Sequence, residues 1–252
     1  MRHPWVRTVL AAVALMAAAV PAGARADTDR YRLDIEAGAA WQDRNDIAIP
    51  GTTGTRFNLA DATAGPAFAS RVTFTWDVAE RWSIRFLAAP LRLSTPFTPE
   101  YDVTFLDATF PAEQPVDATY RFDSYRVSGY YRFEPKGAWS FRVGGTLKVR
   151  DAAIGLSSAT TSQEKANTGV VPLVYGGISW KPSPKLVLDL EIDGAAAPQG
   201  RAIDASIRAE FGSWRTARPY IAYRILDGGA DNDEVYNFAT FQYGLLGVSL
   251  RF

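Results

Sequence analysis

Apolar and polar residues alternate with a period of two along nearly all of the chain after residue 30. In one such segment, Trp139, Phe141 and Val143 alternate with Ser140 and Arg142. This period places apolar side chains on one face of a β-strand and polar side chains on the other. The pattern predicts ten strands, near residues 31–42, 68–77, 82–88, 118–133, 139–150, 169–181, 185–195, 202–212, 215–226 and 236–252.

One predicted strand, near residues 118–133, changes phase along its length. Its apolar positions begin with Tyr120 and Phe122 and continue, beyond Ser124, with Tyr125. An extra residue in a strand exchanges the two faces of everything that follows it. We therefore expect a β-bulge near Ser124.

The first residues have the organisation of an export signal. Arg2 and Arg7 precede an apolar run of about a dozen residues. Residues 24–26 (Ala-Arg-Ala) then supply the small-residue pattern of a cleavage site. The run is shorter than the roughly 20 apolar residues that cross a bilayer as a helix. We expect a cleaved signal peptide at residues 1–26 and one mature domain at residues 27–252.

The composition of the predicted mature domain excludes much chemistry. The only histidine (His3) and both methionines lie within residues 1–26, and the chain has no cysteine. A Ser-His-Asp triad, a cysteine nucleophile and an ordinary zinc or copper site are excluded, and we expect no metal or other cofactor. Residues 1–26 also hold three of the 27 basic residues and no acid, which leaves 24 basic against 27 acidic residues and no attraction for nucleic acid.

The connections between the predicted strands alternate between short and long. Short turns stand near residues 78–80, 134–137, 182–184 and 212–213, and the others, near 43–66, 94–117, 151–168, 196–201 and 227–235, are mostly long and polar. Short turns on one side and long loops on the other are typical of a transmembrane barrel with its turns in the periplasm. The sequence thus predicts an all-β fold, a transmembrane antiparallel up-and-down β-barrel of ten strands, or of eight if two segments are loop hairpins.

Tryptophan is concentrated at one end of this barrel. Five residues lie beside or within the short turns: Trp76, Trp82, Trp139, Trp180 and Trp214. Trp41 is placed at the opposite end of the first strand. Because amphipathic rings favour the headgroup level of a bilayer, we expect the five to form an aromatic girdle at the inner interface.

The last strand ends with apolar residues at every second position (Leu246, Val248, Leu250) before an aromatic C-terminal residue, Phe252. This ending resembles the C-terminal signature of small single-chain Gram-negative outer-membrane β-barrel proteins. The resemblance implies a place in the cell outer membrane, contact with outer-membrane lipid and lipopolysaccharide, and an assembly signal at Phe252 that the barrel-assembly machinery recognises. No pattern in the sequence indicates an oligomeric state.

Enzymes built on such barrels have requirements that this chain does not meet. The omptin proteases resemble it in strand number but use a His-Asp pair. The lipid A deacylases, the palmitoyl transferases and the outer-membrane phospholipase likewise depend on histidine. The predicted mature domain has none, so we expect a protein that is not an enzyme.

The inward face of the predicted barrel is heavily charged. A lumen charge network is expected from Arg32, Asp34, Glu36, Arg71, Arg85, Arg126, Arg142, Lys148, Asp189, Glu191, Asp193, Asp204, Arg208, Glu210 and Arg224. In a narrow barrel these groups would pair and fill the lumen, which favours a structural or surface role with long extracellular loops. One alternative is a narrow porin-like channel for small polar or anionic solutes. The other is a conduit for small hydrophobic compounds through the apolar segment 94–117.

Overall fold

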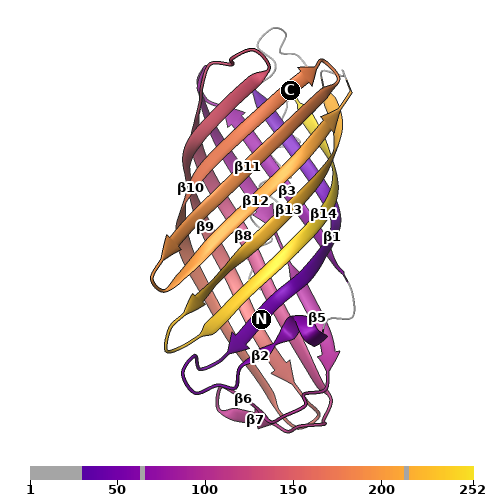
Figure 1. Cartoon of the computed structure of the whole chain (residues 1–252), viewed down its shortest axis with the longest axis vertical. Coiled ribbons are helices and arrows are strands. Elements are labelled where there is room, and N and C mark those ends of the chain that lie inside the picture. The colour runs from indigo at the N-terminus through magenta and orange to yellow at the C-terminus, as the bar shows by residue number, and fades with distance from the viewer. Residues whose placement is uncertain (1–29, 63–65, 213–215) are drawn as a thin grey trace.

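The computed structural model describes residues 30–62, 66–212 and 216–252, and in this part of the chain the wall is a closed barrel of tilted antiparallel strands (Figure 1). The strands of the wall are β1 (Tyr31–Ala48), β3 (Ala67–Asp77), β4 (Trp82–Ala89), β5 (Arg92–Phe97), β8 (Val116–Arg132), β9 (Trp139–Ser157), β10 (Ser162–Ser183), β11 (Leu186–Ala197), β12 (Gly200–Phe211), β13 (Ala217–Asp231) and β14 (Tyr236–Arg251). β4 and β5 both pair with β8 and form one wall strand, so the wall has ten. The predicted fold and strand number are confirmed.

Pairing of the first and last strands closes the barrel. β1 and β14 run antiparallel from Arg32↔Arg251 to Ala48↔Tyr236, with one shift in register between Gln42 and Arg44. Closure removes the free sheet edges, whose unpaired backbone groups would be costly in lipid. No helix in the described part of the chain is both long and apolar enough to cross a membrane.

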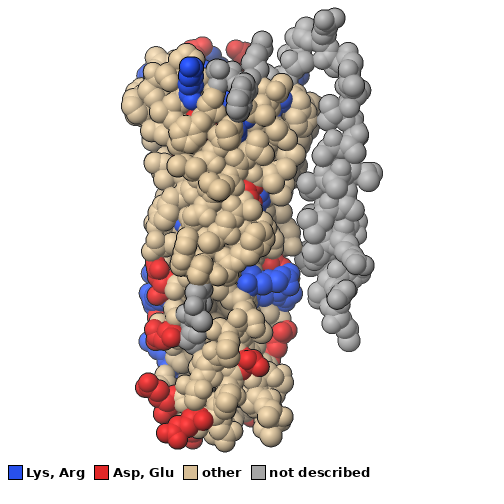
Figure 2. Space-filling model, turned by 90° about the vertical axis from the view of Figure 1, so that its right-hand side faces the viewer, with Lys and Arg blue, Asp and Glu red and all other residues tan. Residues whose placement is uncertain are grey.

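The exposed outer face is apolar on the half of the barrel that carries the short turns and the C-terminus, which we call the inner end. Figure 2 shows a band there that is nearly free of charged side chains, between a charged rim and a charged opposite half. Trp76, Trp82, Trp139 and Trp180 lie at the inner end with 37–52 % of their surface exposed, and Trp214 falls outside the described residues. Trp139 and Trp180 stack with ring centroids 5.6 Å apart.

The expected bulge near Ser124 is absent from β8, and this prediction was wrong. β8 pairs with β9 in one register from Asp117↔Ser157 to Arg132↔Arg142. Tyr120 is buried on the same inward face as Ser124 and Arg126. The apparent change of phase has another cause: beyond the apolar band of the outer face, the outward residues of β8 are polar and the inward ones become apolar, as in a water-soluble barrel.

The wall also reaches further toward the outer end than the alternation indicated. β9 and β10 stay paired to Ser157↔Ser162, so the segment 151–168 is a hairpin with a four-residue turn and the predicted long loop is wrong. β1 likewise continues to Ala48. Two changes hid the hairpin: in β9 the apolar residues Ile154 and Leu156 move to the inward face, and in β10 residues 162–168 are mostly polar on both faces.

One side of the lumen at the outer end is filled by an apolar plug. The connection after β1 holds β2 (Phe57–Asn58) and the 3-10 helix η1 (Leu59–Ala62), and the connection after β5 holds β6 (Val103–Phe105) and β7 (Ala108–Phe110). Their side chains pack inward in one cluster: Ile49, Phe57, Leu59, Val103, Phe105 and Phe110 are each at most 6 % exposed. The apolar segment 94–117 thus turns into the barrel mouth, and β6 and β7 lie at this end in Figure 1.

Candidate functional site

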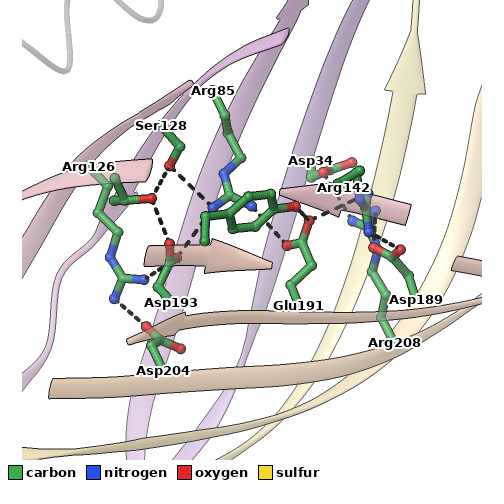
Figure 3. Close-up of polar contacts among 12 residues, drawn as sticks. Asp34, Arg85, Arg126, Ser128, Arg142, Asp189, Glu191, Asp193, Asp204 and Arg208 are labelled. Carbon is green, nitrogen blue, oxygen red and sulfur yellow. Dashed lines mark hydrogen bonds and ion pairs between the residues drawn. The ribbon is translucent and has the colours of Figure 1, made fainter. Parts of the chain in front are cut away.

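Charged side chains from facing strands meet in the middle of the lumen (Figure 3). Arg85 of β4 reaches two carboxylates of β11, at 3.0 Å from Oε2 of Glu191 and 3.3 Å from Oδ2 of Asp193. β4 and β11 are four strands apart around the ten-strand wall, so these contacts cross the lumen. The Arg85 guanidinium also lies 4.5 Å from the ring centroid of Tyr175, whose hydroxyl donates to Glu191 at 2.8 Å.

Asp204 of β12 connects two further arginines. Arg224 donates to both of its carboxylate oxygens at 2.7 Å, a bidentate arrangement that fixes both groups. Arg126 of β8 donates to Asp204 and, at 3.0 Å, to Oδ2 of Asp193. Asp204, Arg126 and Arg224 are all buried, and a buried charge is tolerated only when it is paired.

Arg208 of β12 forms the other half of the arrangement. Its guanidinium lies 3.1 Å from each of three carboxylates, those of Asp34, Asp189 and Glu210. Arg142 donates to Asp189 from β9. The result is a continuous set of ion pairs across the barrel, which we call the charged layer and define by Asp34, Arg85, Arg126, Arg142, Asp189, Glu191, Asp193, Asp204, Arg208, Glu210 and Arg224.

The other residues expected in the lumen network have separate positions. Arg32 pairs with Asp34 at 3.2 Å, and Arg71 pairs with Glu36 beside the charged layer. Of the expected set, only Lys148 makes no ion pair with any residue in the described part of the chain. No cluster of His, Cys, Asp or Glu among the described residues has a geometry for holding a metal ion.

An outer cavity of about 910 Å³ lies between the charged layer and the outer end, on the side of the lumen that the plug leaves open. Aromatic and aliphatic side chains form much of its wall, including Tyr120, Phe122, Ile154 and Phe241. Its volume is within the range of small-molecule sites, and its lining of apolar groups with a few polar ones is typical of them. Sequence patterns did not indicate it, because it depends on which strands stop pairing and on where the plug lies.

Two basic residues of β9 line this cavity. Lys148 is 3 % exposed, and its amine lies 4.8 Å from the ring centroid of Phe122. Arg150 donates to the side-chain oxygen of Asn167, a neutral partner. Arg126 and Arg224, which lie near Lys148, are already paired with Asp204, so the cavity has a cationic floor under apolar walls.

The level at which the apolar band of the outer face ends is marked on the outside of the wall. Ile203 and Ile225 are outward-facing and exposed, and the next outward positions on the same two strands are Arg201 and Asp227. Nε of Arg201 donates to Oδ1 of Asp227 at 2.5 Å. This hydrogen bond lowers the pKa of the Asp227 carboxyl.

The C-terminal residue is held at the inner end. The backbone nitrogen of Phe252 donates to the carbonyl oxygen of Tyr31 at 3.0 Å, and the nitrogen of Tyr31 donates back at 2.9 Å. Their rings stack with centroids 5.9 Å apart. Phe252 therefore lies on the seam that closes the barrel, where β1 meets β14.

No protein-family model matches the chain, and no curated protein is significantly similar to it in sequence. Among solved structures it is similar to the outer membrane protease OmpT from Escherichia coli, with a TM-score of 0.55 at 8 % identity over 92 % of this chain and 99 % of that one. Weaker likenesses include the translocator domain of the autotransporter NalP from Neisseria meningitidis (TM-score 0.45, 11 % identity, 97 % and 98 % covered). An outer membrane channel from Pseudomonas putida F1 has a TM-score of 0.44 at 8 % identity, with 92 % and 99 % covered. The chain thus has the fold of the Gram-negative outer-membrane β-barrel proteins.

Proposed function

We propose that this chain is a non-enzymatic integral protein of the bacterial outer membrane, with a structural or surface role and a lumen that the charged layer closes to ions. The apolar outer face of the inner half and the closure between β1 and β14 support the membrane location. The tryptophans at the inner end fit an aromatic girdle at the periplasmic interface.

The observation that carries the closed lumen is the set of ion pairs between strands on opposite sides of the wall. Arg85 to Glu191 joins β4 with β11, and Arg126 to Asp204 joins β8 with β12. A water-filled path through a barrel of this size would have to pass between these groups, and a ten-strand barrel is near the size that side chains can fill. The porin-like alternative needs the same groups to be separated by water.

Planar-bilayer conductance tests this proposal. The purified wild-type protein should give no steady ohmic current, because the charged layer blocks the lumen. Glu191→Ala removes the carboxylate that Arg85 and Arg142 share and should open a current, whereas Glu234→Ala, at an exposed carboxylate far outside the layer, should not. Steady ohmic conductance of the wild type would contradict the closed lumen and favour the channel.

A further inference from the structure

The barrel wall has an opening near the outer end, between β10 and β11. These two strands are paired from Ser183↔Leu186 to Val174↔Gly194, and no pairing between them continues beyond that point in the described chain. Each strand nevertheless goes on: β10 stays paired with β9 to Ser162, and β11 stays paired with β12 to Ala197. We call this opening the window.

The residues at the edges of the window explain why the two strands separate. Pro172, two residues beyond the last pair, has no backbone N–H to offer a neighbouring strand. The opposite edge is Ala195, Ala196 and Ala197, whose methyl groups fill little space. Because both edges line the outer cavity, the cavity extends sideways into the window.

The window lies at the outer boundary of the lipid-facing band. Ala196 pairs with Arg201, whose ion pair with Asp227 marks the level where the outer face turns polar. Val170 and Val174, on the opposite edge, are 66 % and 69 % exposed on the outside of the barrel. An apolar chain that left the cavity here would therefore reach the outer leaflet and not bulk water.

One ion pair crosses the rim of the cavity on the outer side of the window. Nζ of Lys165, on β10, lies 3.1 Å from Oε2 of Glu234, in the turn between β13 and β14. This ion pair spans from one cavity wall to the other, since both residues line the cavity. The lateral outlet lies between this ion pair and the Val174↔Gly194 pair, and next to the latter its edges are apolar, with Val170 to Leu173 on β10 and Ala195 to Ala197 on β11.

The polar end of the cavity is cationic. Lys148 is buried at its floor and forms no ion pair among the described residues, although the Asp204 carboxylate lies near enough to attract it, and Arg150 on the same strand donates to the neutral Asn167 side chain. A buried cation without a counter-ion is costly, and an anionic group seated beside it would relieve that cost. Bound anionic oxygens could accept hydrogen bonds from both side chains.

We propose that the outer cavity binds a single-chain amphiphile with an anionic oxygen head group, with the head at Lys148 and Arg150 and the hydrocarbon chain passing through the window toward the outer leaflet. The cationic floor selects the head group, the apolar walls hold the first part of the chain, and the lateral outlet admits a tail longer than the cavity. This assignment does not depend on whether the lumen conducts ions. It also places the binding of an apolar compound at the barrel wall and not at the segment 94–117, whose apolar side chains Val103, Phe105 and Phe110 are buried in the plug.

Binding to the full-length mature protein in lipid nanodiscs tests the proposal, with hexadecanoate, hexadecyl phosphate and hexadecanol as probes in a calorimetric titration. At least one of the two anions should bind at least tenfold more tightly than the alcohol. The anion that binds more tightly shows whether the site prefers a carboxylate or a phosphate head group. Binding of the alcohol as tight as that of both anions, or no binding of either anion, would overturn the proposal.

Two lysines of the same cavity provide a matched pair of variants. Lys148→Met should weaken binding of the preferred anion at least tenfold, because it removes the head-group partner. Lys165→Met should leave it within about twofold, because Lys165 is already paired with Glu234 at the rim. Equal effects of the two variants would overturn the placement of the head group. Lys148→Met removes a buried unpaired charge, so it should fold at least as well as the wild type, which its heat-modifiable mobility in gels would establish.

The route of the chain is tested separately. Ala196→Trp places a bulky side chain on the outer face beside the window, far from the floor of the cavity, because Ala196 pairs with the outward-facing Arg201. It should obstruct the exit and weaken binding of the sixteen-carbon anion at least fivefold. Octyl phosphate or octanoate, which is short enough to stay inside, should bind as it does to the wild type. Unchanged binding of the long anion would overturn the exit through the window. Conductance measurements on the same variants would show no difference from the wild type, so failure here and failure of the closed lumen are distinguishable.

Discussion

Two Asp–Arg pairs join the same two strands, β12 and β13, on opposite faces of the wall, and they allow the energetic role of the charged layer to be measured. Asp204 and Arg224 face the lumen and are both buried, whereas Arg201 and Asp227 face outward and are solvent-accessible. The residue types and the strands are the same in both pairs, which differ in burial and in the second arginine, Arg126, that Asp204 also holds.

Asp204→Asn should destabilise the barrel by about 3–5 kcal/mol, the usual cost of removing one partner from a buried pair. Arg126 would keep its ion pair with Asp193, whose Oδ2 lies 3.0 Å away. Arg224 would lose its carboxylate partner and remain as a buried cation against the ring of Tyr243. Asp227→Asn should cost about 1 kcal/mol or less, because exposed ion pairs contribute little.

Urea unfolding in lipid vesicles, followed by tryptophan fluorescence, would give the free energy of unfolding of each variant. If the loss in Asp204→Asn arises from the stranded Arg224, then adding Arg224→Met should recover most of it. Equal losses in Asp204→Asn and Asp227→Asn, or no recovery in the double variant, would refute the reasoning.

Three more changes test other parts of the fold. Phe105→Ala, at a fully buried plug position, should remove about 3–5 kcal/mol of packing and make the segment after β5 susceptible to limited proteolysis while the barrel stays folded. Gly144→Ala should destabilise the wall by about 1–3 kcal/mol in the same urea assay, because its Cβ would lie 2.1 Å from the carbonyl oxygen of Gly129. Phe252→Ala removes the ring that stacks on Tyr31 at the closing seam and should lower the yield of heat-modifiable barrel in an outer-membrane assembly assay.

Alternation predicted the wall because the lipid-facing band imposes one rule on every strand: apolar residues face outward and polar residues face the lumen. The rule fails where the wall rises above the lipid. In β8 the outward residues there are Asp117, Thr119 and Arg121 and the inward ones include Tyr120, so an unbroken strand resembles a bulged one. The hairpin above residue 150 was missed for the same reason.

The candidate site was predictable in its residue types but not in its geometry. The ion pairs of the charged layer form between strands far apart in sequence, and a list of inward charges does not say which groups meet or that Lys148 is left without a carboxylate. The window depends on pairing that stops, and Pro172 within an otherwise regular strand was its one signal in the sequence. The plug could be suspected from the apolar segment 94–117, although its packing against Ile49 and Phe57 could not.

The central claim is that the charged layer divides the lumen into two separate compartments, and cysteine accessibility tests it most directly because the chain has no cysteine of its own. A single cysteine at Ala152 lines the outer cavity, and one at Ser140 faces the lumen on the inner side of the layer. A small membrane-impermeant cationic thiol reagent added outside sealed lipid vesicles that hold only this protein, inserted with its outer end facing out, should label Ala152→Cys and leave Ser140→Cys unmodified, whereas both should react once detergent opens the vesicles. Rapid labelling of Ser140→Cys in the sealed vesicles would contradict the account, since the reagent could reach it only through the charged layer.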